Sequence, residues 1–320
     1  MIEHRGSEQL TRQEGLGLFT NLRAQISISQ IYQAKYSSPI TTQLTEDVKR
    51  YRDPDQMVDD VGRVVIQLTN FCATIKDGSI TQPSEIIRRT MSLDTDLMSI
   101  LFTAPPSWRY QTVKVPVIDG EPVTRTVWGD SYHVCRNLSV SGVWNNARSA
   151  RLLMHKMLLG AVNSLEDSSP GSSGLLQQQL IASQSRQIAH QLVDDICASV
   201  HFHLGLANRS SSLETVAAHL GAFLPNTNMI HSETHYPSPL PPSFEVPGAG
   251  GVTLAWTLLI AANSGFASPP PRKWIIGCLE KIGHSMESNK ALTMAQSLQD
   301  GMDSRAWMSP EVSPSHDTLW

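Results

Sequence analysis

Apolar residues recur along most of this chain at steps of three and four residues, which is the spacing of one face of an α-helix. The pattern is clearest in the segment Trp144–Leu159, where one stripe contains Val143, Ala147, Ala150, Met154 and Met157. Four leucines in the same segment make the helix apolar on most of its circumference. Because such a helix belongs in a protein interior, the pattern predicts a buried central helix.

The same spacing predicts further helices on both sides of the central one, at residues 14–36, 58–75, 83–101, 175–200, 250–261, 272–286 and 289–298. The stretch 113–127 alternates instead, with valine at 113, 115, 117, 123 and 127 on either side of Asp119-Gly120. An Asp-Gly pair between two alternating runs is a hairpin signal. We therefore expect an all-α protein, mainly a helical array, with one short β-hairpin near 113–127.

Composition sets the expected domain limits. Residues 1–13 contain few apolar anchors and are expected to be a disordered N-terminus, and residues 301–320 are expected to be a tail. Residues 14–300 are expected to form one helical domain. It contains two predicted flexible loops, 166–174 and 225–251, because both stretches are rich in proline, glycine or serine.

Three basic side chains, Arg148, Arg151 and His155, share one face of the predicted central helix. A buried charge without a partner is very costly, so these side chains need carboxylates or carbonyl groups. Asp194 and Asp195 lie in the predicted helix 175–200, which supplies them if it is an antiparallel neighbour. We therefore expect these five residues to form a structural ion-pair network. The alternative is that the basic face binds an anion.

No motif of a known type of active site is present. The chain has neither a G-x-S-x-G elbow nor a G-x-x-x-x-G-K phosphate loop. The segment 231–235, His-Ser-Glu-Thr-His, lacks the H-E-x-x-H order of a zinc helix, and the four cysteines contain no C-x-x-C pair. We therefore expect no catalytic, cofactor-binding or metal-binding residues, and no enzyme activity.

Charge and hydropathy narrow the expected partners. The chain has 25 Lys and Arg against 29 Asp and Glu, a net charge of −4, whereas proteins that grip phosphates normally carry a basic excess. The longest apolar run, Val252–Ala262, is too short to cross a bilayer, and the N-terminus does not have the pattern of a secretory signal. We expect protein partners or self-association, no direct DNA binding by this chain and no membrane span.

The central helix contains the pattern W-N-x-x-R-x-x-R-x-x-x-H. In this it resembles the regulatory region of fungal transcription factors that carry a six-cysteine zinc cluster. Residues 194–205 resemble its D-I-C-A-S-V-P-F-H-L-G block, with His201 in place of proline. Shorter matches are G-L-x-L-F-x-x-x-R-x-Q-I at 15–26, P-x-W-x-Y at 106–110, and G-G-x-x-L-x-W-P-L at 250–258, with Thr257 in place of proline.

This resemblance implies a transcription-factor-like regulatory protein in the nucleus, with the cytoplasm as the alternative location. It also implies a link to a fungal secondary-metabolite gene cluster. The family's six-cysteine cluster is absent from these residues, so we expect a truncated or mis-started factor, or a protein that has lost its DNA-binding domain. Two other interpretations stay open: a ligand-binding protein or enzyme with a pocket near the central helix, and a scaffold that only dimerises.

Overall fold

The computed structural model describes residues 6–51, 57–115, 117–118, 121–122, 127–168, 174–205 and 249–301. Its α-helices are α2 (Gln13–Gln33), α3 (Pro39–Asp47), α4 (Val58–Lys76), α5 (Pro83–Phe102), α6 (Leu138–Ser168), α7 (Leu175–His203), α9 (Ala249–Asn263), α10 (Pro269–Ser285) and α11 (Asn289–Gln299). Short 3-10 helices are η1 (Ser7–Thr11), η2 (Val48–Arg50) and η3 (Pro106–Trp108). The described residues are mainly helical, which confirms the all-α prediction.

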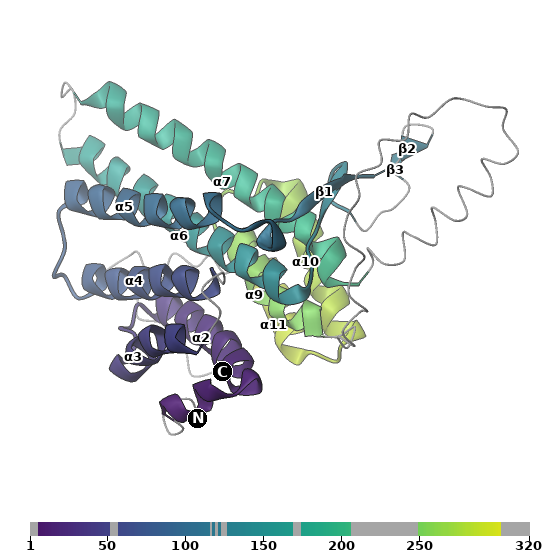
Figure 1. Ribbon diagram of the computed structural model, residues 1–320. Helices are drawn as coiled ribbons and strands as arrows, with labels where there is room; N and C mark the ends of the chain where they lie inside the picture. The colour runs from purple at the N-terminus through teal and green to yellow at the C-terminus, as the bar shows by residue number, and fades with distance from the viewer. Residues whose placement is uncertain are drawn as a thin grey trace, which may run out of the picture.

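The longest described helix, α6, is the centre of the structure. It contacts α4, α5, α7 and α9, and α5 and α7 both pack along much of its length (Figure 1). Its Ala147, Leu152 and Met154 are completely buried. The buried central helix is therefore confirmed, and it extends beyond 144–159 at both ends.

The β-structure is an antiparallel ribbon that differs in extent from the predicted hairpin. Strand β1 (Gln111–Lys114) pairs with β4 (Ser131–Val134), and the two-residue strands β2 (Val117–Ile118) and β3 (Glu121–Pro122) pair farther out. A hairpin near 113–127 is thus confirmed, and the ribbon extends past residue 127 into β4, whose two adjacent buried residues do not follow the alternation used for the prediction. The expected Asp119-Gly120 turn lies outside the described residues.

The N-terminal prediction needs a correction. Residues 1–13 were expected to be disordered, but η1 occupies Ser7–Thr11 and α2 begins at Gln13. The reason is Leu10, which is fully buried in a small cluster with Phe19, Leu44 and Val48. Burying one leucine side chain contributes about 2 kcal/mol, and this holds the short segment against α2 and α3.

The structure describes only parts of the two predicted loops and of the predicted tail. Helix α6 continues to Ser168, so the first three residues of the predicted loop 166–174 are helical, and residues 169–173 lie outside the described part. Of the predicted loop 225–251, the last three residues begin α9 and the rest lies outside the description. All but the first residue of the predicted tail 301–320 lies outside it as well.

A buried ion pair between α2 and α4 was missed in the sequence. Nη2 of Arg23 lies 3.0 Å from Oδ1 of Asp59 and donates to the Val58 carbonyl oxygen, also at 3.0 Å. The mixed charges of residues 46–60 are typical of a solvated surface, yet Asp59 is only 4% exposed. The signal that was available is the position of Arg23, one helical turn after the buried Phe19.

Gly62 on α4 lets this ion pair form. A Cβ atom at Gly62 would lie 2.5 Å from Cζ of Arg23, closer than any van der Waals contact allows. The guanidinium group cannot move aside without leaving Asp59 and the Val58 carbonyl oxygen. A helix normally favours alanine over glycine by about 1 kcal/mol, so a glycine here indicates a packing requirement.

We therefore expect Gly62→Ala to lower the free energy of unfolding by about 2–4 kcal/mol, because it overpacks the site and displaces a buried charge. Urea unfolding followed by circular dichroism measures this change. Gly17→Ala on α2 is the matched control, since a Cβ there meets nothing within 4 Å and should be neutral or stabilising. An equal response of the two variants would contradict the role of Gly62.

Candidate functional site

The strongest concentration of buried polar side chains surrounds Arg148 on α6. Its side chain is 4% exposed, and Nη1 donates to Oδ1 of Asn145 at 3.0 Å. Nη2 lies 3.1 Å from Nδ1 of His133 on β4, and Nε lies 4.0 Å from a carboxylate oxygen of Asp195 on α7. A guanidinium group has donors only, so His133 accepts here and carries its own proton on Nε2.

Asn145 connects this cation to α7 and α9. Its Nδ2 lies 2.9 Å from Oγ of Ser199 and 3.2 Å from Nε2 of His203. Since the amide nitrogen donates, Nε2 of His203 accepts, and its Nδ1 donates to the Gly250 carbonyl oxygen at 3.2 Å. We call Arg148, Asn145, His133, Asp195, Ser199 and His203 the Arg148 network.

Aromatic rings close the other side of the Arg148 network. The Arg148 guanidinium lies 4.9 Å from the ring centroid of Tyr110 and 5.9 Å from that of Trp144. The two rings meet edge to face at 4.9 Å. Nε1 of Trp144 donates to the Trp108 carbonyl oxygen at 2.6 Å. The positive charge is therefore stabilised by π faces and neutral hydrogen-bond acceptors more than by a carboxylate.

The two histidines of the Arg148 network are held in the neutral form. Burial, together with the Arg148 charge, lowers the pKa of His133 to about 4 against the opposing effect of Asp195. Burial also lowers the pKa of His203 to about 4, in spite of its bond to the Gly250 carbonyl oxygen. Each neutral imidazole accepts a hydrogen bond from Arg148 or Asn145 and so has a structural role, and the six residues of the network include no activated nucleophile.

Arg151 does not pair with Asp194 or Asp195, so that part of the predicted network was wrong. It makes a two-pronged contact with Asp94 on α5, with Nε to Oδ1 at 2.7 Å and Nη2 to Oδ2 at 3.2 Å. Three residues along a helix turn the side chain by about 60° from Arg148. That rotation points Arg151 to α5, whereas Arg148 points to α7.

The two predicted aspartates have separate roles. Asp195 approaches Arg148 at 4.0 Å and accepts a hydrogen bond from Gln191 at 3.0 Å. Asp194 accepts a hydrogen bond from Nε1 of Trp128 at 3.1 Å instead. Asp194 and Asp195 are neighbours on α7, so their side chains lie on different sides of the helix. Both arginines of the central helix are therefore occupied by protein groups, which leaves no basic face for the anion that we had considered as the alternative.

His155 is buried next to the Arg151–Asp94 pair. Its Nε2 lies 3.8 Å from Oδ2 of Asp94, too far for a hydrogen bond, and neither ring nitrogen bonds to another described residue. Burial lowers its pKa, and Asp94 opposes this while Arg151 adds to it. His155 is thus a neutral packing residue in the described structure.

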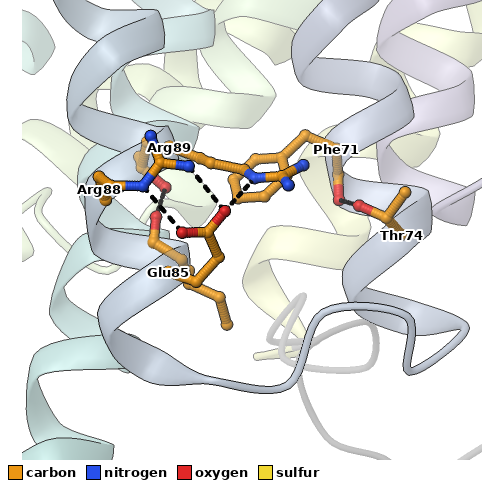
Figure 2. Close-up of polar contacts among 7 residues, drawn as sticks. Phe71, Thr74, Glu85, Arg88 and Arg89 are labelled. Carbon is orange, nitrogen blue, oxygen red and sulfur yellow. Dashed lines mark hydrogen bonds and ion pairs between the residues drawn. The ribbon is translucent and has the colours of Figure 1, made fainter.

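An exposed ion cluster on α5 contrasts with these buried pairs. Figure 2 shows the Glu85 carboxylate accepting from Arg88 and from Arg89, with Nε of Arg88 at 2.8 Å and Nε of Arg89 at 2.5 Å. The two arginines lower the pKa of Glu85 to about 2. The cluster lies beside the end of α4, where Thr74 donates to the Phe71 carbonyl oxygen. Solvent screens such exposed pairs, so they contribute little to stability.

The residue types that bind metals do not gather in the described part of the chain. No group of three His, Cys, Asp or Glu side chains there has the arrangement of a metal site. All four cysteines are free, and burial raises the pKa of Cys72 to about 12, which makes it unreactive. The 231–235 segment lies outside the described residues. No described helix has the combination of length and apolar character that a bilayer span needs.

Two hollows accompany these side chains. A cavity of about 30 Å³ lies among α2, α4, α6 and α9 and is lined by Ser149, whose Oγ bonds to no described residue. This volume admits water but no cofactor. A surface groove of about 540 Å³ lies along α10. None of the six residues of the Arg148 network lines the cavity or the groove, and the network's role is to position helices.

The ion pair between Arg151 and Asp94 leads to a prediction about stability. We expect Arg151→Ala to lower the free energy of unfolding by about 3 kcal/mol, because it leaves the half-buried Asp94 without its cation. Arg88→Ala is the control, since it removes a similar two-pronged contact from an exposed site (Figure 2). Urea unfolding of both variants measures the difference. Similar, small losses would indicate that Arg151 is solvated.

The neutral histidines predict the direction of the pH dependence. The folded-state pKa of His203 is lowered from 6.5 to about 4, so the unfolded chain binds more protons between these values. The contribution of His203 to the free energy of unfolding should therefore be fully present above about pH 6.5. It should decrease by on the order of 3 kcal/mol as the pH falls to 4. Urea unfolding at several pH values tests this. His203→Gln should flatten the slope, and an unchanged slope would contradict the assignment.

Comparison with known proteins assigns no family to this chain. The family models, the curated proteins and the solved structures that were searched contain no match. The resemblance to fungal zinc-cluster transcription factors therefore rests on the sequence segments alone. What the structure establishes is the all-α fold class.

Proposed function

We propose that this chain is a transcription-factor-like regulatory protein of the fungal zinc-cluster type that acts in the nucleus through a protein partner. The observation that supports this is the convergence of four resembling segments on the Arg148 network. The W-N-x-x-R helix contributes Asn145 and Arg148, and the 194–205 block contributes Ser199 and His203. The P-x-W-x-Y segment contributes Tyr110, and the G-G segment contributes the Gly250 carbonyl oxygen.

This convergence gives the motif residues a physical meaning. Four segments far apart in the sequence share one set of buried hydrogen bonds and ring contacts, so a substitution in one segment removes a partner from another. Such residues are required together by the fold and not by a reaction. The motifs thus support an architecture that is shared with the family. We therefore place the proposed function on the surface of this architecture.

The charges support a partner other than DNA. The two arginines of the central helix are engaged with Asn145, His133 and Asp94, and so they do not reach a phosphate backbone. The chain as a whole has more acidic than basic residues. Non-specific DNA binding depends on the release of counterions by surplus Lys and Arg, and specific reading in this family depends on a zinc-held module that these residues do not contain.

The proposal is tested in a reporter assay. We expect the chain, fused to a DNA-binding domain of known preference, to change expression from a matching promoter in a fungal host severalfold. The DNA-binding domain alone is the control. A folded, nuclear fusion that leaves expression unchanged would contradict the proposal. A link to a secondary-metabolite gene cluster, which the resemblance implies, is tested by measuring transcripts of neighbouring genes after deletion of the gene.

A gel-shift experiment separates partner-mediated action from direct DNA binding. The purified 320-residue chain should not shift promoter fragments at physiological salt, because its charge balance offers few phosphate contacts. The zinc-cluster type of DNA-binding domain serves as the positive control for the fragments. A salt-sensitive, sequence-selective shift by the chain alone would contradict the partner-mediated mechanism and indicate a basic surface on this chain.

A further inference from the structure

The structural role of the Arg148 network does not account for the groove along α10. It has a volume of about 540 Å³ and is lined by Leu204, Pro270, Lys273, Trp274, Gly277, Cys278 and Lys281. All but Leu204 belong to one face of α10, at helical spacing. Helix α10 packs on α9 and α11 and makes fewer contacts with α7 (Figure 1).

Gly277 makes the groove deep enough to receive a side chain. It follows Trp274 by three residues on the same face, and a Cβ atom built on it meets nothing within 4 Å. A helix interior normally prefers alanine at such a position, so a glycine that relieves no internal clash leaves open space outside the helix. The half-buried Cys278 and Leu204 supply the apolar surface around this space.

Trp274 forms a wall of the groove that is already held in place. Its ring lies 5.8 Å from the ring of Trp128, and Trp128 is fixed by its hydrogen bond to Asp194. A tryptophan whose orientation is set before binding loses little conformational entropy when a partner covers it. Tryptophan is also among the residues that contribute most to protein–protein affinity. The groove therefore has the features of a preorganised apolar recognition site.

Two ammonium groups lie at the ends of this apolar surface. Lys273 and Lys281 are exposed and are separated by eight residues, about 12 Å along the helix axis. Among the described residues no carboxylate forms an ion pair with either of them. The nearest acid in the sequence, Glu280, accepts a hydrogen bond from Gln299 on α11. In a chain with a net charge of −4, this face is locally positive.

We propose that the α10 groove binds an acidic amphipathic helix of a partner protein. The apolar side chains of that helix fill the space above Gly277 and against Trp274, and its carboxylates pair with Lys273 and Lys281. Helix-in-groove recognition uses anchors at i, i+3, i+4 and i+7, which spans the distance between the two lysines. The proposal rests on the proposed function for the existence of a partner, but the surface is tested without reference to transcription.

The test uses the full chain and a fluorescently labelled helical peptide of about 15 residues, with leucines on one face and glutamates two turns apart. We expect saturable binding in fluorescence anisotropy that weakens as salt rises. Gly277→Leu, which fills the groove, should weaken binding by about tenfold or more, as should charge reversal of Lys273 and Lys281. Gly17→Leu and Lys35→Glu, on α2 and in the loop after it, are the matched controls and should bind as the unaltered chain does.

The outcomes separate the proposal from its competitors. Absence of peptide binding, or equal binding by the Gly277→Leu and Gly17→Leu variants, would overturn it. A peptide with glutamine for glutamate that binds equally well would overturn the role of the lysines. A change in oligomeric state in Gly277→Leu without a change in peptide binding would assign the groove to a second copy of the chain. Peptide binding by a chain that fails the reporter assay would retain the surface and overturn only the proposed function.

Discussion

The burial of one cation, Arg148, constrains the structure around it. A guanidinium group removed from water must find acceptors or aromatic faces for its charge, or its burial costs several kcal/mol. Here the acceptors come from α6 itself and β4. The Asn145 amide on α6 is held in turn by Ser199 and His203 of α7, and His203 bonds to α9. The positions of these elements are therefore linked, since moving any one of them leaves a buried polar group unpaired.

Arginines with little or no exposed surface also join helices at two other contacts. Arg23 and Asp59 join α2 to α4, and Arg151 and Asp94 join α5 to α6. Helices whose contact faces consist of alanine, valine, leucine and methionine can pack in several registers with similar free energy, because apolar contact has little directionality. A charged hydrogen bond is directional, so each pair selects one register. We interpret the three arginines as determinants of helix orientation.

Burial also sets the protonation of the interior groups. The histidines of the Arg148 network are neutral and accept hydrogen bonds, the cysteine thiols have raised pKa values, and the cavity among α2, α4, α6 and α9 admits only water. Accessible charged groups lie outside this core, for example on α5 and α10. The proposed regulatory role works through such surface groups and does not depend on the buried ones.

The sequence by itself determined the helical class, the buried central helix and the shared face of Arg148, Arg151 and His155, because helical periodicity sets the angle of each side chain about its own axis. It did not determine which neighbour each side chain meets. Tertiary packing placed α5 beside Arg151 and α7 beside Arg148, so Asp94 replaced the expected Asp194. Packing also decided the burial of Asp59. A sequence pattern predicts that a charged residue is exposed to solvent, unless its ion-pair partner on another helix is known.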